Sequence, residues 1–112
     1  MGLTNTTPDL LPGTLDLLIL RALVAGPLHG YAIVQRLRVV SRDVVQVGEG
    51  SLYPALQRLL LNGWATARSG ASENNRRARF YSLTTAGKRH LAAERAAFER
   101  LSDAIVRVLR EA

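Results

Sequence analysis

Four polar side chains in the segment 49–64 are of kinds that bind phosphate groups and the edges of nucleic-acid bases. The segment reads EGSLYPALQRLLLNGW, in which Ser51 and Tyr53 supply hydroxyls. Hydroxyls beside the free N–H groups of a helix start suit phosphate oxygens. Gln57 and Arg58 follow one turn later, and in the major groove glutamine pairs well with adenine and arginine with guanine. The spacing predicts a helix whose first turn faces phosphate and whose second turn faces base edges.

Pro54 lies early in this predicted helix. The first four N–H groups of a helix have no partner within it, so we expect Pro54 to fall where no hydrogen bond is lost. Proline also disfavours helical geometry at the preceding residue, Tyr53. Two interpretations of Tyr53 stay open, a phosphate contact and a ring packed in the core, and Arg58 is either a base contact or a solvated charge. The apolar side of the helix consists of Leu52, Ala55, Leu56, Leu59 and Leu60.

A basic hairpin is predicted to follow this helix. The runs WATARS and RFYSL have strand character, and the intervening GASENNRRA is polar and rich in turn residues. Three arginines gather at the tip and the second strand. Strand alternation places Arg77 and Arg79 on one face and Arg76 on the other. A basic hairpin beside a groove-bound helix reaches phosphates or the adjacent minor groove.

The remaining elements are three helices and a connection. The stretch 12–26 has apolar residues at helical spacing, with Thr14 as the expected N-cap, and Gly26-Pro27 ends it. The stretch 28–41 predicts a second helix, and 42–50 predicts a connection or a short strand. Three short helices followed by a two-stranded hairpin predict a mainly α chain with a winged helix-turn-helix, completed by a long final helix.

The final stretch, 84–112, predicts one long helix capped by Thr84 or Thr85. A heptad-like apolar seam runs along it. We expect this seam to hold two chains together, or to pack in part on the first helix of its own chain. The domains are then 1–83 for nucleic-acid binding and 84–112 for dimerisation. The seam consists of Leu91, Phe98, Leu101, Ile105 and Val108, with Ala112 in the same register.

Charge and composition narrow the functional classes. The chain of 112 residues has 15 Lys and Arg against 9 Asp and Glu, a net charge of +6, and a basic balance favours a polyanionic partner. Cysteine is absent, and no apolar run approaches the length of a membrane span. His29 and His90 are far apart and lie in no ligand motif, so we expect no metal, no cofactor and no catalytic residue. We expect a cytoplasmic, non-enzymatic protein that does not bind membranes.

The residues also resemble a known family. GTLDLLILRAL, GPLHGYAI, GEGSLYPALQRLLLNGW and SENNRRARFYSLTTAGKRHL together resemble the PadR family of bacterial transcriptional regulators. The resemblance runs from about Gly13 to Leu91 and weakens along the last helix. Longer family members carry a multi-helix C-terminal domain, so the sequence looks like the short type with a single C-terminal helix.

The resemblance implies a role for particular residues. The family's groove-facing helix matches Ser51, Leu52, Tyr53, Pro54 and Arg58, and its wing matches Arg76, Arg77 and Arg79. The HGY motif places Tyr31 at the start of the second helix, where it either reaches the DNA backbone or packs in the core. The family further implies a dimer held by the C-terminal helix and repression of a nearby operon. Release from DNA by a small aromatic effector is also typical of it.

Two functions from different classes follow. The first is a homodimeric, sequence-specific repressor bound to double-stranded DNA at a pseudo-palindromic operator, since two recognition helices would lie about one helical turn apart. The alternative is a winged-helix module that binds another protein and does not bind DNA. The alternative shares the fold and the apolar seam but has no need of a basic wing.

Overall fold

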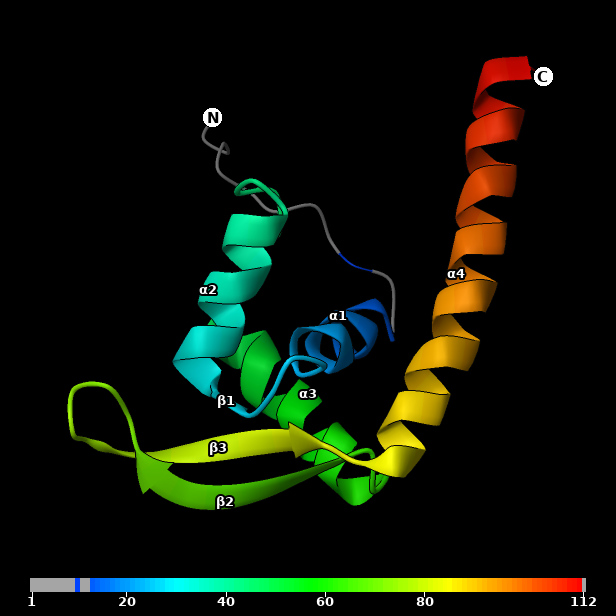
Figure 1. The fold of residues 1–112 in the computed structure, drawn as a ribbon. Helices are drawn as coiled ribbons and strands as arrows, with labels where there is room; N and C mark the ends of the chain where they lie inside the picture. Colours follow the sequence, from blue (N-terminus) through cyan, green and yellow to red (C-terminus); the bar gives the residue numbers. More distant parts are fainter. Residues whose placement is uncertain (1–9, 11–12, 112) are drawn as a thin grey trace.

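The computed structural model describes residue 10 and residues 13–111, and Figure 1 shows the course of the chain. Three helices and one short strand form the first half, a β-hairpin follows, and a long helix leads away from the rest of the molecule. In chain order the elements are α1 (Thr14–Ala22), β1 (Leu28–His29), α2 (Gly30–Val40), α3 (Glu49–Leu61), β2 (Ala65–Ala71), β3 (Arg77–Leu83) and α4 (Thr85–Glu111).

The core lies where α1, α2 and α3 meet the inner end of the sheet. Each helix contributes an apolar stripe at helical spacing, as the sequence predicted. The predicted N-cap of α1 is wrong: Gly13 takes that position in a left-handed conformation (φ 86°), and no side chain caps the helix. The largest fully buried side chains are Ile19, Leu20, Leu23, Ile33, Leu56 and Leu59.

Two residues assigned to the second helix form a strand instead. Leu28 pairs with Tyr81 and His29 with Phe80, so β1 becomes an edge strand of a sheet in the order β1-β3-β2. His29 is the N-cap of α2, and its Nδ1 accepts a hydrogen bond from the Ala32 N–H at 3.2 Å. An N-cap residue has extended backbone geometry, so the segment before α2 is free to join the sheet.

The hairpin has longer strands and a shorter tip than predicted. β2 and β3 pair from Ala65–Leu83 to Ala71–Arg77, which leaves only 72–76 as the turn. At that turn the Ser72 N–H donates to the Arg76 carbonyl at 2.8 Å. The seven-residue strands carry the tip well away from the three helices (Figure 1).

The turn from α3 into β2 lies at Asn62-Gly63, a residue pair typical of a helix end. Gly63 adopts φ 72°, a backbone conformation that residues other than glycine, asparagine and aspartate rarely take. Its N–H donates to the Leu60 carbonyl, and the Trp64 N–H donates to the Leu59 carbonyl at 3.0 Å. These two bonds satisfy carbonyls at the helix end and aim the chain into the sheet.

The start of α4 is hydrogen-bonded to the turn between α3 and β2. Thr84 is its N-cap, as expected, since the Thr84 Oγ1 accepts from the Gly87 N–H at 2.9 Å. The same hydroxyl donates to the Gly63 carbonyl at 2.7 Å. Gly87 lies so close to the Trp64 carbonyl that a Cβ there would be 2.1 Å from its oxygen. No helix among the described residues is both long and apolar enough to span a membrane.

Candidate nucleic-acid interface

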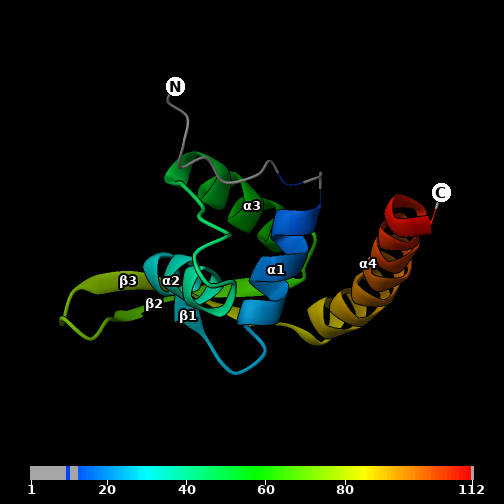
Figure 2. The same cartoon turned by 90° about the horizontal axis from the view of Figure 1, so that it is seen from above.

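The outward side of α3 presents the polar residues that the sequence singled out. Ser51, Pro54 and Gln57 are all exposed. The start of α3 and the hairpin tip lie on the side of the molecule away from α4 (Figure 2). Leu52 does not belong to this surface: it is 2% exposed and is part of the core cluster, so its side chain anchors the helix and cannot contact a ligand.

The explanation offered for Pro54 is wrong. α3 begins at Glu49, so Pro54 is the sixth residue of the helix and lies inside it. A donor at this position would bond to the Gly50 carbonyl, and proline has no hydrogen to give. The helix nevertheless continues through Tyr53 and Pro54 to Leu61. The missing bond falls on the exposed side of the helix, since Gly50 and Pro54 are both exposed.

The two tyrosines near this surface are placed differently. Tyr53 is 51% exposed, and its ring lies against Gly30, where an added Cβ would be 3.3 Å from the hydroxyl oxygen. One side of the ring is therefore packed while the rest faces solvent. Tyr31 is 68% exposed, and its hydroxyl accepts a hydrogen bond from the Gln35 amide at 2.7 Å. Core packing, the alternative interpretation of Tyr31, is wrong.

Arg58 is bound to a carboxylate on another helix. Its Nε donates to Asp16 Oδ2 at 3.0 Å and its Nη2 to Asp16 Oδ1 at 2.7 Å, a two-pronged pair between α3 and α1. Asp16 is 8% exposed, whereas about half of the Arg58 side chain is exposed. The hydrogen bond to Asp16 raises the pKa of the Arg58 guanidinium. Arg58 is therefore not a freely solvated charge.

The wing carries its arginines as predicted. Arg76, at the tip, and Arg77 and Arg79, in β3, are all exposed. The guanidinium carbon of Arg79 lies 5.8 Å from the centre of the Tyr81 ring, within range of a cation–π attraction. Arg77 and Arg79 alternate with Ala78 along β3, so they share a face.

The seam on α4 does not form one continuous surface in this chain. Leu91 is buried in the core, and α1 contacts α4. The rest of the seam is exposed beyond this point, where α4 leads away from the body (Figure 1). The large exposed apolar side chains of α4 are Phe98, Leu101, Ile105, Val106, Val108 and Leu109.

Sequence reasoning missed the role of Asp16. The signal was present: Asp16 precedes Ile19, Leu20 and Leu23 at helical spacing, so a carboxylate stands on an apolar stripe. A buried carboxylate needs a partner. The identity of that partner, 42 positions away, depends on the tertiary fold.

The histidines have structural contacts. The His90 ring stacks on Trp64, with ring centres 3.5 Å apart and planes at 11°. His29 caps α2 and meets the Phe80 ring edge-on at 5.3 Å. Within residues 13–111 and at residue 10, no three metal-ligating side chains come together.

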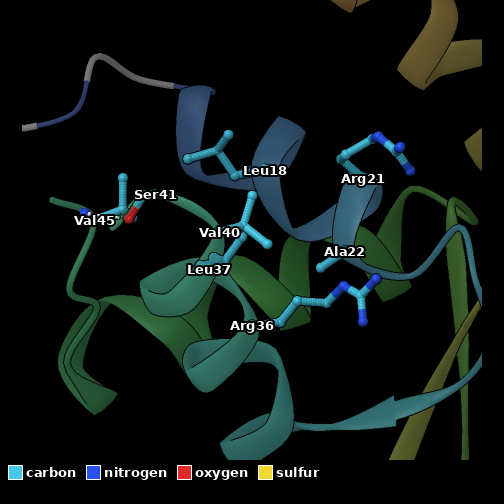
Figure 3. Close-up of a pocket in the computed structure, with 8 residues that line it drawn as sticks. All are labelled: Leu18, Arg21, Ala22, Arg36, Leu37, Val40, Ser41 and Val45. Atoms are coloured by element: carbon cyan, nitrogen blue, oxygen red, sulfur yellow. Dashed lines mark hydrogen bonds between the residues drawn. The ribbon is translucent and has the colours of Figure 1, made fainter. Parts of the chain in front are cut away.

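A pocket of about 210 Å³ lies between α1, α2 and the loop after α2 (Figure 3). Its walls are apolar, and Arg21 and Arg36 stand at its edge. Neither arginine side chain has a hydrogen-bond or ion-pair partner among the described residues. The other lining residues are Leu18, Ala22, Leu37, Val40, Ser41 and Val45.

Comparison with known proteins agrees with the winged-helix geometry. A transcriptional regulator from Clostridium thermocellum has a TM-score of 0.76 and 27% identity, over 85% of this chain and 92% of that one. PadR of Bacillus subtilis, solved in complex with operator DNA, has a TM-score of 0.63 and 28% identity, over 71% of this chain and 45% of that one.

A relative in sequence and a family model point the same way. An uncharacterized 37.1 kDa protein in transposon TN4556 of Streptomyces fradiae is 41% identical over 87 residues, which make up 78% of this chain and 24% of that protein. This chain therefore spans about a quarter of that relative's length. The model described as "Transcriptional regulator PadR-like family" matches residues 19–93. The chain belongs to the PadR-like family of transcriptional regulators.

Proposed function

We propose that this protein is a sequence-specific, DNA-binding transcriptional repressor. The single observation that carries the proposal is the exposed surface made by the first turns of α3 and the arginines of the wing. The Ser51 hydroxyl stands in the first turn of α3, where a helix start favours phosphate, and the Tyr53 hydroxyl follows in the second turn. Gln57, one turn further, is long enough to reach a base edge. The complex of Bacillus subtilis PadR with operator DNA supports this interpretation by similarity.

We propose in addition that the repressor acts as a homodimer on a pseudo-palindromic operator. The support is the exposed apolar side of α4, which includes Phe98, Leu101, Ile105 and Val108. Apolar side chains at heptad-like spacing on a projecting helix are typical of a surface that packs on another helix. Leu91 belongs to the core of its own chain, so this surface begins after it.

The wing provides the first prediction. Changing Arg76 and Arg77 to alanine should weaken binding to the DNA upstream of the protein's own gene. The slope of log affinity against log salt concentration should flatten by about 0.9 for each phosphate that the variant no longer neutralises. Affinities measured across a salt series test this.

A matched control uses arginines on the far side of α4 from its apolar surface. Arg100→Ala with Arg107→Ala removes the same charge from exposed positions and should leave the slope unchanged. An unchanged slope in the wing variant would contradict the wing assignment. Absence of any DNA binding at low salt, together with a tight protein partner, would favour the alternative protein-interaction module.

The pocket in Figure 3 supports a second proposal, that a small aromatic effector binds there and releases the repressor from DNA. A cavity of about 150 Å³ already holds benzene in another protein, and this pocket is larger. The two arginines without partners at its edge favour an effector with an anionic group. A ligand wedged between α1 and α2 would act on the helices that support α3.

The effector proposal predicts which probe binds. Benzoate should shift the methyl NMR signals of Leu18, Leu37 and Val45, and benzyl alcohol should shift them less. Changing Arg21 and Arg36 to glutamine should weaken benzoate binding about tenfold, because charge-assisted hydrogen bonds are removed. Equal binding of both probes, or shifts confined to α4, would contradict this site.

A further inference from the structure

The pair between Asp16 and Arg58 leaves part of the guanidinium unused. A guanidinium has five N–H donors in a fixed fork, and Asp16 takes one on Nε and one on Nη2. The edge formed by Nη1 and Nη2 keeps its donors. No hydrogen bond from these donors to another described residue is present. That edge has the geometry of the two-pronged contact that arginine makes with guanine O6 and N7.

The position of Arg58 on α3 agrees with this use. It follows Pro54 by four residues and Ser51 by seven, so all three lie along one flank of the helix. About half of its side chain is exposed, although its partner Asp16 is almost fully buried. The carboxylate thus holds the guanidinium from behind while the opposite edge remains accessible.

Such a pair changes the energetics of recognition. A long arginine side chain has many rotamers, and ordering it on binding costs affinity. Here the fork is already ordered by two charge-assisted hydrogen bonds from a carboxylate that is itself fixed in α1. An arginine held in this way has little freedom to move to a phosphate when the base is wrong.

We propose that Asp16, although it lies in α1 outside the recognition helix, is a specificity-determining residue that positions Arg58 to read one guanine in each half-site of the operator. The proposal rests on the proposed DNA binding. It assigns Arg58 to a base and the wing arginines to phosphates, so the two sets of variants have different signatures.

The direction in which Asp16→Asn changes operator affinity distinguishes a positioning role for Asp16 from simpler roles. Replacing Asp16 by asparagine removes a negative charge, which by itself strengthens binding to a polyanion. A latch that withheld Arg58 from DNA would also give tighter binding once removed. Of these roles, only positioning of Arg58 predicts that Asp16→Asn weakens operator binding and removes the preference for guanine at one position.

The experiment compares the wild-type protein with Asp16→Asn, Arg58→Lys and the double variant. The operator is the duplex that the wild-type protein selects from random sequences, and each guanine in turn is replaced by 7-deazaguanine, which lacks N7. For the wild type, replacing one particular guanine in each half-site should lower the affinity about tenfold. Each single variant should bind the intact operator about tenfold more weakly and should lose that penalty. The double variant should be no weaker than either single variant.

Asp43→Asn serves as the matched control, because Asp43 pairs with Arg38 at 2.9 Å and both side chains are exposed. The Asp43→Asn variant should still lose about tenfold in affinity when that guanine is replaced. Retention of the penalty by Asp16→Asn, or tighter operator binding, overturns the proposal. If the wild type selects no duplex, the proposed function itself fails. If it selects one and Asp16→Asn still distinguishes the guanine, only this inference fails.

A measurement on the wild type covers the case in which Asp16→Asn does not fold. The Nε–Hε signal of Arg58 should be protected from exchange with water in the free protein and in the operator complex. Loss of that protection on binding the operator overturns the proposal, because it means that Arg58 leaves Asp16.

Discussion

Replacing Leu101 and Ile105 with aspartate should yield monomers and abolish tight operator binding. Both side chains are exposed on the single chain, so the change should leave the fold of the winged helix intact. Two carboxylates cannot be buried in an apolar contact between helices without a large desolvation cost. Light scattering should then give the mass of one chain, 12.2 kDa.

The decrease in DNA affinity should be large because two linked half-site contacts become one. Linking two binding units raises affinity by about 10²- to 10⁴-fold, and the monomer should lose that gain. Ala93→Asp with Ala96→Asp adds the same two charges at exposed positions on the other side of α4 and should leave the dimer intact. A dimer that survives the first pair of changes would count against the α4 surface.

Replacing Gly87 with alanine should unfold the protein more easily and displace α4. The new Cβ would lie 2.1 Å from the Trp64 carbonyl oxygen and 2.8 Å from a Leu83 methyl group, so backbone must move. We expect a decrease of about 2 kcal/mol in unfolding free energy, since overpacking usually costs about 1–3 kcal/mol. This decrease is net of the gain of about 1 kcal/mol that alanine brings to a helix.

Thermal unfolding followed by circular dichroism measures the effect, with an expected drop in Tm of about 10 °C for a chain of this size. Gly50→Ala is the control: it is also a helical glycine, but a Cβ there meets nothing within 4 Å. That change should keep or raise the Tm. The opposite outcome, a tolerated Gly87→Ala and a harmful Gly50→Ala, would mean that the junction at Trp64 is not tightly packed.

The junction at Gly87 also bears on DNA binding, because it sets the direction of α4 relative to the wing. Thr84 bonds to the Gly63 carbonyl, and His90 stacks on Trp64. In the proposed dimer, a small rotation at this point would change the separation of the two recognition helices. The operator affinity of Gly87→Ala should therefore fall even below the temperature at which it unfolds.

Local patterns were enough to predict most elements. The apolar stripe of α3 and the Asn62-Gly63 stop give a helix that ends where expected, because both depend on neighbours within a turn. The cap at Thr84 and the strands of the wing were predictable for the same reason. The helix start at Glu49 was not, since Pro54 suggested a later start, yet the helix runs through Pro54 without that hydrogen bond.

Contacts between distant segments could not be predicted from the sequence alone. The strand β1 exists only because β3 offers a free edge beside it, and two residues carry no strand signal of their own. The burial of Leu91 depends on where α1 lies beside α4. The closeness of Gly87 to Trp64 reflects the meeting of two chain segments more than twenty positions apart.

The candidate site likewise contains residues whose placement the sequence predicts and residues whose placement depends on the tertiary structure. Residue type and helical spacing determine that Ser51 and Gln57 are polar and outward-facing and that the wing is basic, because side-chain direction follows from backbone period alone. Only the tertiary structure decides that Tyr53 packs against Gly30 and that Arg58 is paired with Asp16. Those outcomes depend on which helix packs beside α3, and that is fixed by the burial of all the apolar stripes together.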